Sequence, residues 1–241
     1  MALSVYPNGA RKALVLSFDD GEIQDRALAA SLRGLGMKAT FFLCSAHLGL
    51  RGPLIRDGEP NEYIKVEAHE LKSVYQDHEI GAHGAHHRGF TRLSEEELAE
   101  EILGDLEVFS SLGVPKPIGG AYPGGHYTLE AAENLGRLGL VYARTTQCTE
   151  SFLAPSNFLT WHPTCHMYYP GLEALIERFL NLDEQELSLF HIYGHSYELD
   201  KKGIDGWGYM EGILTRLSGR EDVWYATLGD YYRFMKSGTN E

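Results

Sequence analysis

Residues 14–21 read Leu14-Val15-Leu16-Ser17-Phe18-Asp19-Asp20-Gly21, an apolar run that ends in two adjacent carboxylates. The run from Leu14 to Phe18 has the length and composition of a buried β-strand. Two carboxylates directly after a buried strand lower the stability of the fold unless a positively charged group or ion lies beside them. The Asp-Gly pair alone is also typical of a turn or of a helix cap, so the run needs support from elsewhere in the chain.

Six further strand-like runs follow this one, with helical patterns between them. They are Ala39–Leu43, Glu79–Ala82, Ile118–Tyr122, Val141–Thr145, Leu187–Tyr193 and Val223–Ala226. Strands that alternate with helices predict an α/β fold with a parallel sheet. At 241 residues, without a repeat or a linker, we expect residues 1–241 to form one domain whose sheet closes into a single (β/α) barrel.

The clearest helical pattern runs from Glu95 to Leu112, and Ser94 with Glu97 predicts a capping box at its start. Another helix is expected near Ile23–Leu35, where Gly36 would end it. Two segments do not fit the alternation and are predicted to be long, functional loops. They are His47–Asn61 and Gln147–Pro170.

Composition excludes several classes of protein. A net charge of −13, with no cluster of Lys or Arg, argues against nucleic acid as a partner. The cysteines Cys44, Cys148 and Cys165 form no CxxC pair, which favours a reducing compartment. We find no apolar segment that would serve as a signal peptide or a membrane span, and therefore expect a cytoplasmic protein.

Reactive groups in parallel α/β barrels lie in the loops that follow the carboxyl ends of strands. The unusual polar residues of this chain fall at such positions. They are Asp19 and Asp20 after the first strand, His83–His87 after the third, Tyr122–Gly125 after the fourth, and His191 and His195 on or after the sixth. The pattern predicts one site on one rim of the barrel.

His83 and His87 are four residues apart, so on a helical turn both imidazoles would face the same way. Imidazole is the commonest neutral metal ligand, and two imidazoles with one carboxylate leave coordination positions open. That arrangement is typical of a catalytic metal. The alternative is a group of surface histidines without a common function.

The pairing of Ser17–Gly21 with His83-x-x-x-His87 resembles the first two motifs of the NodB-homology polysaccharide deacetylases, carbohydrate esterase family 4. The runs Lys38–Phe42 and Phe90–Ser94 also resemble that family. The resemblance extends from Leu14 to about Gly125 and returns near His195. It implies a distorted seven-stranded barrel and metal-dependent removal of an acetyl group from an N-acetylated sugar or oligosaccharide.

The same resemblance implies a role for each matching residue. Asp19 would be the general base and Asp20 the carboxylate ligand of one divalent ion. His83 and His87 would complete the protein ligands of that ion. Zinc is the default, with cobalt, nickel or manganese as alternatives.

The third motif departs from the family pattern. Here it reads Ala121-Tyr122-Pro123-Gly124-Gly125, without the arginine that orients the base in the family. We expect the backbone N–H of Tyr122 to help hold an oxyanion, and Pro123 to lie at the substrate.

Two histidines are candidates for the catalytic acid. Leu187–His191 fits the family's Leu-x-Leu-x-His spacing, and His195–Asp200 resembles the His-Pro-Trp-Glu-Leu-Asp version of some relatives. We favour His195 because the acid should stand at the end of the strand. His191 stays open, either as the acid or as a neighbour on the same strand face.

The run Trp161-His162-Pro163-Thr164-Cys165-His166 gathers an aromatic ring, imidazoles and a thiol in one loop. We expect Trp161 and His162 to line the substrate cleft; a second metal-binding set and an ordinary packed loop are the alternatives. Two other functions remain open. One is hydrolysis of a non-peptide C–N bond in a small amide such as a ureide or formamide, and the other is metal-dependent carbohydrate binding without catalysis.

Overall fold

The computed structural model of the chain describes residues 5–56, 58–182 and 186–238. Seven parallel strands follow one hydrogen-bonded path, and β10 (Val223–Ala226) pairs with β1 beside it. In path order the strands are β7 (Tyr142–Arg144), β6 (Gly119–Ala121), β5 (Glu79–Ala82), β2 (Thr40–Leu43), β1 (Lys12–Asp19), β9 (Ser188–Gly194) and β8 (Cys165–His166).

The sheet is strongly curled. Along one edge of β1, residues 12–15 pair with β10 and residues 17–19 pair with β2. The two neighbouring strands therefore share that edge. The chain after β7 connects the far edges of the sheet, since Trp161 bridges to Arg144 and Cys165 pairs with β9. The predicted α/β fold with a distorted, barrel-like parallel sheet is confirmed.

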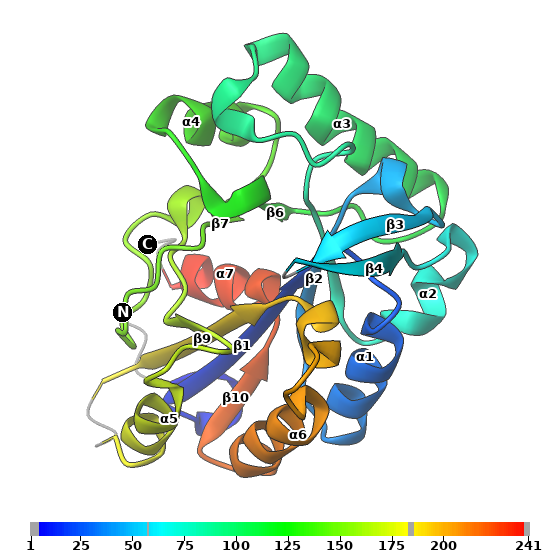
Figure 1. Cartoon of the computed structure of the whole chain (residues 1–241). Helices are drawn as coiled ribbons and strands as arrows, with labels where there is room; N and C mark the ends of the chain where they lie inside the picture. The colour runs from blue at the N-terminus through cyan, green and yellow to red at the C-terminus, as the bar shows by residue number, and fades with distance from the viewer. Residues whose placement is uncertain (1–4, 57, 183–185, 239–241) are drawn as a thin grey trace.

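Helices flank the curled sheet, as Figure 1 shows. They are α1 (Asp25–Gly34), α2 (Leu71–Val74), α3 (Glu95–Ser111), α4 (Leu129–Arg137), α5 (Leu172–Leu180), α6 (Gly206–Leu217) and α7 (Leu228–Ser237). Short 3₁₀ segments are η1 (Pro7–Gly9), η2 (Ser45–His47), η3 (Ala68–Glu70), η4 (Phe90–Arg92), η5 (Pro123–Gly125), η6 (Phe158–Thr160) and η7 (Ser196–Asp200). Among the described residues, no helix has the length and apolar character needed to cross a membrane.

The predicted helix boundaries follow from local chemistry. Ser94 Oγ accepts from the N–H of Glu97 at 3.2 Å, and the Glu97 carboxylate accepts from the N–H of Ser94 at 2.9 Å. This capping box fixes the start of α3, as expected. Helix α1 ends just before Gly36, whose φ of 68° is the left-handed value that favours glycine after a helix.

Strand β1 is buried along its whole length, because both of its faces are covered. Leu14, Leu16 and Phe18 pack in one hydrophobic cluster, and Ala13 with Val15 pack in another on the opposite face. Burying a side chain such as Phe18 contributes about 1.5–3 kcal/mol. Packing on both faces therefore holds β1 in place, and its last residues lie at the rim of the sheet.

The segments predicted as loops contain strands that the sequence reasoning missed. Strands β3 (Arg51–Arg56) and β4 (Glu59–Ile64) form an antiparallel hairpin that begins in the first of them and extends three residues beyond it, and β8 lies in the second. Each of the two strands contains a proline, Pro53 or Pro60, and a two-stranded hairpin has free edges that tolerate proline. The base of the hairpin is tied to the site, because Val66 N–H donates to Gly21 O at 2.9 Å.

Candidate active site

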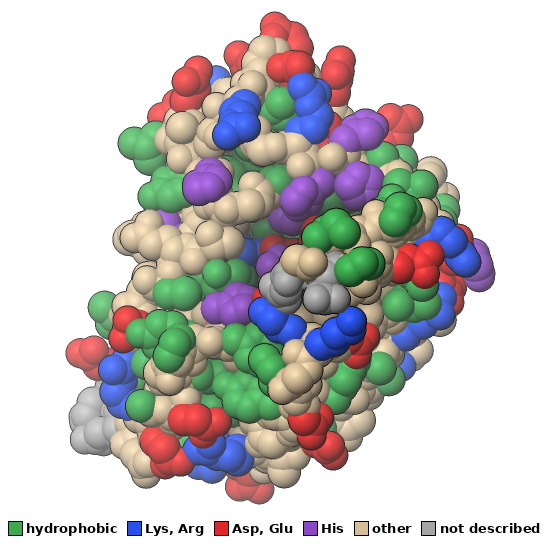
Figure 2. Space-filling model, viewed as in Figure 1, with side chains coloured by type: hydrophobic (Ala, Val, Ile, Leu, Met, Phe, Trp, Pro, Cys, Tyr) green, Lys and Arg blue, Asp and Glu red, His purple; other side chains and the backbone are tan. Residues whose placement is uncertain are grey.

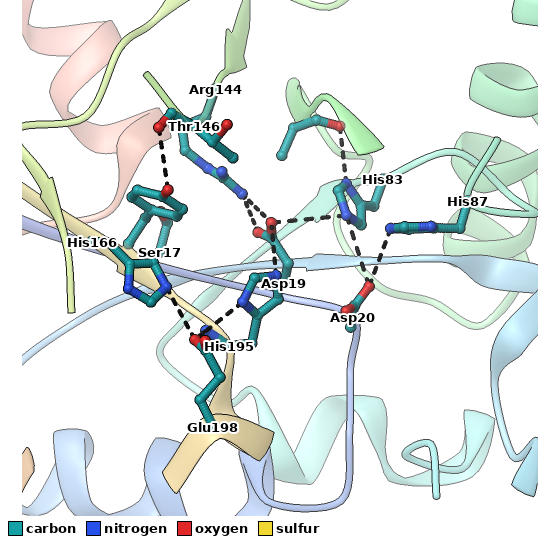
Figure 3. A network of polar contacts seen from close by, with 12 residues as sticks. Ser17, Asp19, Asp20, His83, His87, Arg144, Thr146, His166, His195 and Glu198 are labelled. Carbon is teal, nitrogen blue, oxygen red and sulfur yellow. Dashed lines mark hydrogen bonds and ion pairs between the residues drawn. The ribbon is translucent and has the colours of Figure 1, made fainter. Parts of the chain in front are cut away.

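The rim formed by the carboxyl ends of β1, β5 and β9 brings the predicted site residues together (Figure 3). Asp19 is the last residue of β1 and Asp20 follows it. His83 comes directly after β5, and His195 directly after β9. The polar residues that lie far apart in the sequence thus meet at one place, as the strand-end pattern predicts.

Asp20, His83 and His87 form a group that could hold a metal ion. Asp20 Oδ1 lies 3.4 Å from His87 Nε2 and 3.9 Å from His83 Nε2. These separations are longer than good hydrogen bonds. They approach the spacing of about 3.3 Å between ligand atoms around a tetrahedral zinc ion with bonds of about 2.0–2.1 Å. The donor set and its spacing therefore fit a divalent cation.

Backbone conformation is unusual at two of these three residues. Asp20 has a φ of 80° and His87 a φ of 57°, values that side chains other than glycine rarely adopt. The 83–87 segment is a turn and not the helical turn expected from its spacing, although the two imidazole rings lie 4.8 Å apart. Strain of this kind persists where the surrounding structure imposes it, and it clusters at functional sites.

His83 is held in one orientation and in its neutral form. Its Nδ1 pairs with the carbonyl oxygen of Ala121 at 3.0 Å, which leaves Nε2 facing Asp20. Burial lowers the pKa of His83 to about 4. A neutral imidazole with a fixed tautomer is ready to ligate a metal.

Two buried acids of α3 hold the segment that carries the histidines. Asp105 accepts from the N–H of Ser45 at 2.8 Å and from the N–H of His83 at 2.9 Å. Glu101, one turn earlier, accepts from the N–H of His86 at 2.8 Å. Burial raises the pKa of Asp105 to about 6. The position of the His83 ring therefore depends on a helix outside the three-residue group.

An Asp105→Ala variant is expected to bind a divalent ion about 10–100-fold more weakly, because partners that orient ligands contribute effects of this size. Zinc affinity, measured by competition with a chelating dye, tests this expectation. Glu100→Ala, which removes an exposed acid from the same helix, is the control and should leave the affinity unchanged. Equal affinities in both variants would show that Asp105 has no such role.

Arg144 supplies the arginine that the third motif lacks. The Arg144 guanidinium, carried by β7, contacts both carboxylate oxygens of Asp19, and both side chains are buried. Burial alone would raise the pKa of Asp19, but the charge of Arg144 outweighs it and holds that pKa at about 2. The third motif does lack an arginine, but the inference that Asp19 therefore has no orienting arginine was wrong. A charged residue inside the predicted strand Val141–Thr145 was the available signal, because a buried guanidinium needs a carboxylate partner.

Aromatic rings fix the position of this guanidinium. Arg144 Cζ lies 4.9 Å from the centre of the Tyr193 ring and 5.5 Å from that of Phe42. Both distances are within the range of cation–π contact. Arg144 therefore holds Asp19 from a single, packed position.

His195 stands on the other side of Asp19, with Nε2 3.9 Å from Asp19 Oδ2. Its Nδ1 lies 3.2 Å from Glu198 Oε2. Burial lowers the pKa of His195, but the hydrogen bond that its Nδ1 donates to Glu198 and the charge of Asp19 outweigh burial and raise it. The same Glu198 oxygen lies 3.0 Å from His166 Nε2. Sequence analysis placed Glu198 in a family-like run and His166 in a possible second metal-binding set, but it assigned neither residue to this contact with His195.

His191 lies deeper, in the same strand. It is buried, its Nε2 pairs with Ser17 Oγ at 2.9 Å, and burial lowers its pKa well below the usual value. A neutral imidazole without solvent access is a poor source of a proton at neutral pH. These observations favour His195 over His191 as the acid.

Two of the predicted roles are corrected. The backbone N–H of Tyr122 donates to the carbonyl oxygen of Arg144 at 3.0 Å within the sheet, so it does not face the site as an oxyanion donor. Trp161 is fully buried in a core cluster with Tyr142 and Tyr231, and therefore does not line a substrate cleft. Tyr122 lies between β6 and β7, and Trp161 lies between β7 and β8.

The remaining predicted contacts stay predictions. Pro123 is buried in η5. His162 pairs through Nδ1 with Thr145 Oγ1 at 2.6 Å, and its ring lies 5.5 Å from that of Tyr127. Thr145 directly follows Arg144, the residue that contacts Asp19.

A cavity of about 500 Å³ opens directly on the metal-binding group. Asp20 and His87 form one wall, and the hairpin and its flanks form the other, with Leu50, Leu54 and Tyr63 among the lining residues. Figure 2 shows histidine side chains around a hollow near the middle of this face. The site is therefore open to a ligand of moderate size.

Sequence comparison identifies one family. The family model described as polysaccharide deacetylase matches residues 7–143, which include Asp19, Asp20, His83 and His87. No curated protein sequence matches the chain at a significant level.

Solved structures share the fold across nearly the whole chain. A Mycobacterium smegmatis protein described as a polysaccharide deacetylase is 13% identical, covers 97% of this chain and 93% of its own, and has a TM-score of 0.67. A family 4 carbohydrate esterase from Bacillus anthracis is 16% identical, with 98% and 87% covered and a TM-score of 0.58. Another, from Streptomyces lividans in complex with acetate, is 14% identical, with 91% and 94% covered and a TM-score of 0.57.

Proposed function

Because this chain belongs to the polysaccharide deacetylase family, we propose that it is a metal-dependent hydrolase that removes the acetyl group from an N-acetylated sugar or oligosaccharide. One observation carries the proposal. Asp19 Oδ2 lies between two nitrogens, His83 Nε2 at 3.8 Å and His195 Nε2 at 3.9 Å. A carboxylate placed between a metal-binding imidazole and a protonatable one is suited to amide hydrolysis, where one proton is removed and another delivered.

Asp20, His83 and His87 would hold the ion, and their nitrogen and oxygen donors favour zinc, with cobalt, nickel or manganese as alternatives. Bound there, the ion would polarise the acyl carbonyl and lower the pKa of water at the site. Three protein ligands leave room for both water and substrate, which is typical of a catalytic metal.

Asp19 would accept the proton of the attacking water. Arg144 keeps this carboxylate ionised and fixes both of its oxygens, so the base is always in its charged form and in one orientation. His195 would then donate the proton on Nε2 to the departing nitrogen. Glu198 holds Nδ1 of that ring, which keeps Nε2 directed toward Asp19.

A second candidate is hydrolysis of a small-molecule amide. Leu50, Leu54 and Ile55 present apolar side chains to the cavity, which polar side chains such as Glu22, His47 and Lys65 also line. Three cysteines without a disulfide are consistent with a reducing compartment such as the cytoplasm, where small amides are the more accessible substrates.

Acetate release from N-acetylglucosamine oligomers, with zinc supplied, tests the proposal. We expect turnover by the wild type and a loss of about 10²–10⁴-fold in kcat for His195→Ala, since general acids contribute effects of this size. His69→Ala, which removes an exposed histidine of η3, should be unaffected. Turnover of formamides or ureides with none of the sugars would favour the second candidate, and binding of sugars without any acetate release would favour a silent carbohydrate-binding protein.

A further inference from the structure

A second cluster of metal-ligating side chains lies beside the first. Within residues 5–56, 58–182 and 186–238, two groups of three side chains could each hold a metal ion, and the second consists of His166, His195 and Glu198. Strand β8 carries His166, the end of β9 leads to His195, and η7 carries Glu198. Figure 3 shows the three side chains pointing toward one another.

The donor atoms of this second cluster are spaced as closely as those of the first. Glu198 Oε2 lies 3.0 Å from His166 Nε2 and 3.2 Å from His195 Nδ1. The corresponding separations from Asp20 Oδ1 are 3.4 and 3.9 Å. The two distances from Glu198 Oε2 are thus close to the separation of about 3.3 Å expected between ligand atoms around tetrahedral zinc. All three donors lie within 4.8 Å of one another.

Charge and access also suit a cation. Although burial raises the pKa of Glu198, its hydrogen bonds with His166 and His195 outweigh burial and hold that pKa well below its usual range. The cluster therefore presents a carboxylate between two imidazoles. Each of the three side chains keeps about a quarter of its surface exposed, at 23% for His166, 25% for His195 and 24% for Glu198. An ion can reach the cluster from solvent.

We propose that His166, His195 and Glu198 form a second, inhibitory site for a zinc-class divalent cation. The inhibition rests on the proposed function, in which His195 is the catalytic acid. A cation on Nδ1 of His195 displaces the proton that this ring now shares with Glu198, and His166 would bind the cation as a neutral imidazole. The metallated ring of His195 then holds its remaining Nε2 proton far more tightly than an imidazolium does. The leaving nitrogen is no longer protonated, and turnover stops.

Direct binding measurements on the full chain test the site without reference to activity. We expect the wild type to bind two zinc ions in equilibrium dialysis, one tightly and one more weakly, and His166→Gln to bind only the tight one. Glutamine can still donate a hydrogen bond to Glu198 but supplies no imidazole ligand, so the surroundings of His195 are retained. His69→Gln, an exposed histidine outside both clusters, should bind two ions. A single ion in the wild type would overturn the proposal.

Activity against zinc concentration then tests the inhibition. The wild type should show a rise as the first site fills and a fall as the second fills. In His166→Gln the fall should move to at least about tenfold higher zinc, the effect expected from loss of one ligand. Inhibition of both proteins at the same zinc concentration would contradict the assignment. If no amide substrate is hydrolysed, the proposed function fails, while the count of two ions against one still decides whether the second site exists.

Discussion

Asp20→Asn is expected to abolish tight binding of the divalent ion and to lower kcat/KM by about a thousandfold or more. The substitution removes the only carboxylate from the group of Asp20, His83 and His87, whose other two members are imidazoles without a negative charge. Loss of the several kcal/mol that a metal contributes to the transition state corresponds to a rate effect of this size. Elemental analysis of the purified variant, together with acetate release, measures both parts of the expectation.

Asparagine is the informative replacement because it tolerates the left-handed backbone of Asp20, where φ is 80°. A loss of metal is then due to the ligand and not to the fold. Asp77→Asn is a matched control, since Asp77 also has a positive φ, of 68°, but is exposed and lies outside the site. A His83→Ala/His87→Ala double variant should also lose the ion. One ion per chain in Asp20→Asn, bound as tightly as in the wild type, would falsify the ligand assignment.

Much of the fold could be predicted from hydrophobic pattern alone. Strands such as β5 and β10 were predicted at their observed boundaries, because short apolar runs between helices leave few alternatives. The β3–β4 hairpin could not be predicted in this way. Its strands contain Pro53 and Pro60 and form a separate two-stranded sheet, so neither a buried run nor a strict alternation marks them.

The site was only partly predictable. The motifs and their spacing were enough to predict Asp19, Asp20, His83 and His87 as candidate site residues. Arg144 and Glu101 do not, because their roles depend on which strand or helix lies beside the rim. Trp161 was wrongly predicted to be a site residue. An aromatic residue in a polar loop suggested a substrate contact, but its ring is buried in the core. A single sequence contains the residues, but the sheet order decides which of them meet.

Arg144→Met is expected to destabilise the chain by about 3–5 kcal/mol at neutral pH, because it leaves the buried carboxylate of Asp19 without its counter-ion. Methionine retains most of the side-chain length, so lost packing is a minor part of the effect. The double variant Asp19→Leu/Arg144→Met removes both charges and should be closer to the wild type in stability than Arg144→Met is. Urea unfolding of the three proteins in the presence of a chelator measures the differences.

The pH dependence of this deficit identifies its cause. In the wild type the folded pKa of Asp19, about 2, lies below its unfolded value of 3.8, so the stabilisation is present above pH 4 and is lost as pH falls toward 2. Without Arg144, burial is no longer offset and the folded pKa rises above the unfolded one. The variant then loses stability as pH rises from about 4 toward that raised pKa. The gap between wild type and Arg144→Met should therefore be small near pH 3 and widen toward pH 7, whereas a gap that does not change with pH would mean that Arg144 acts by packing and not by charge.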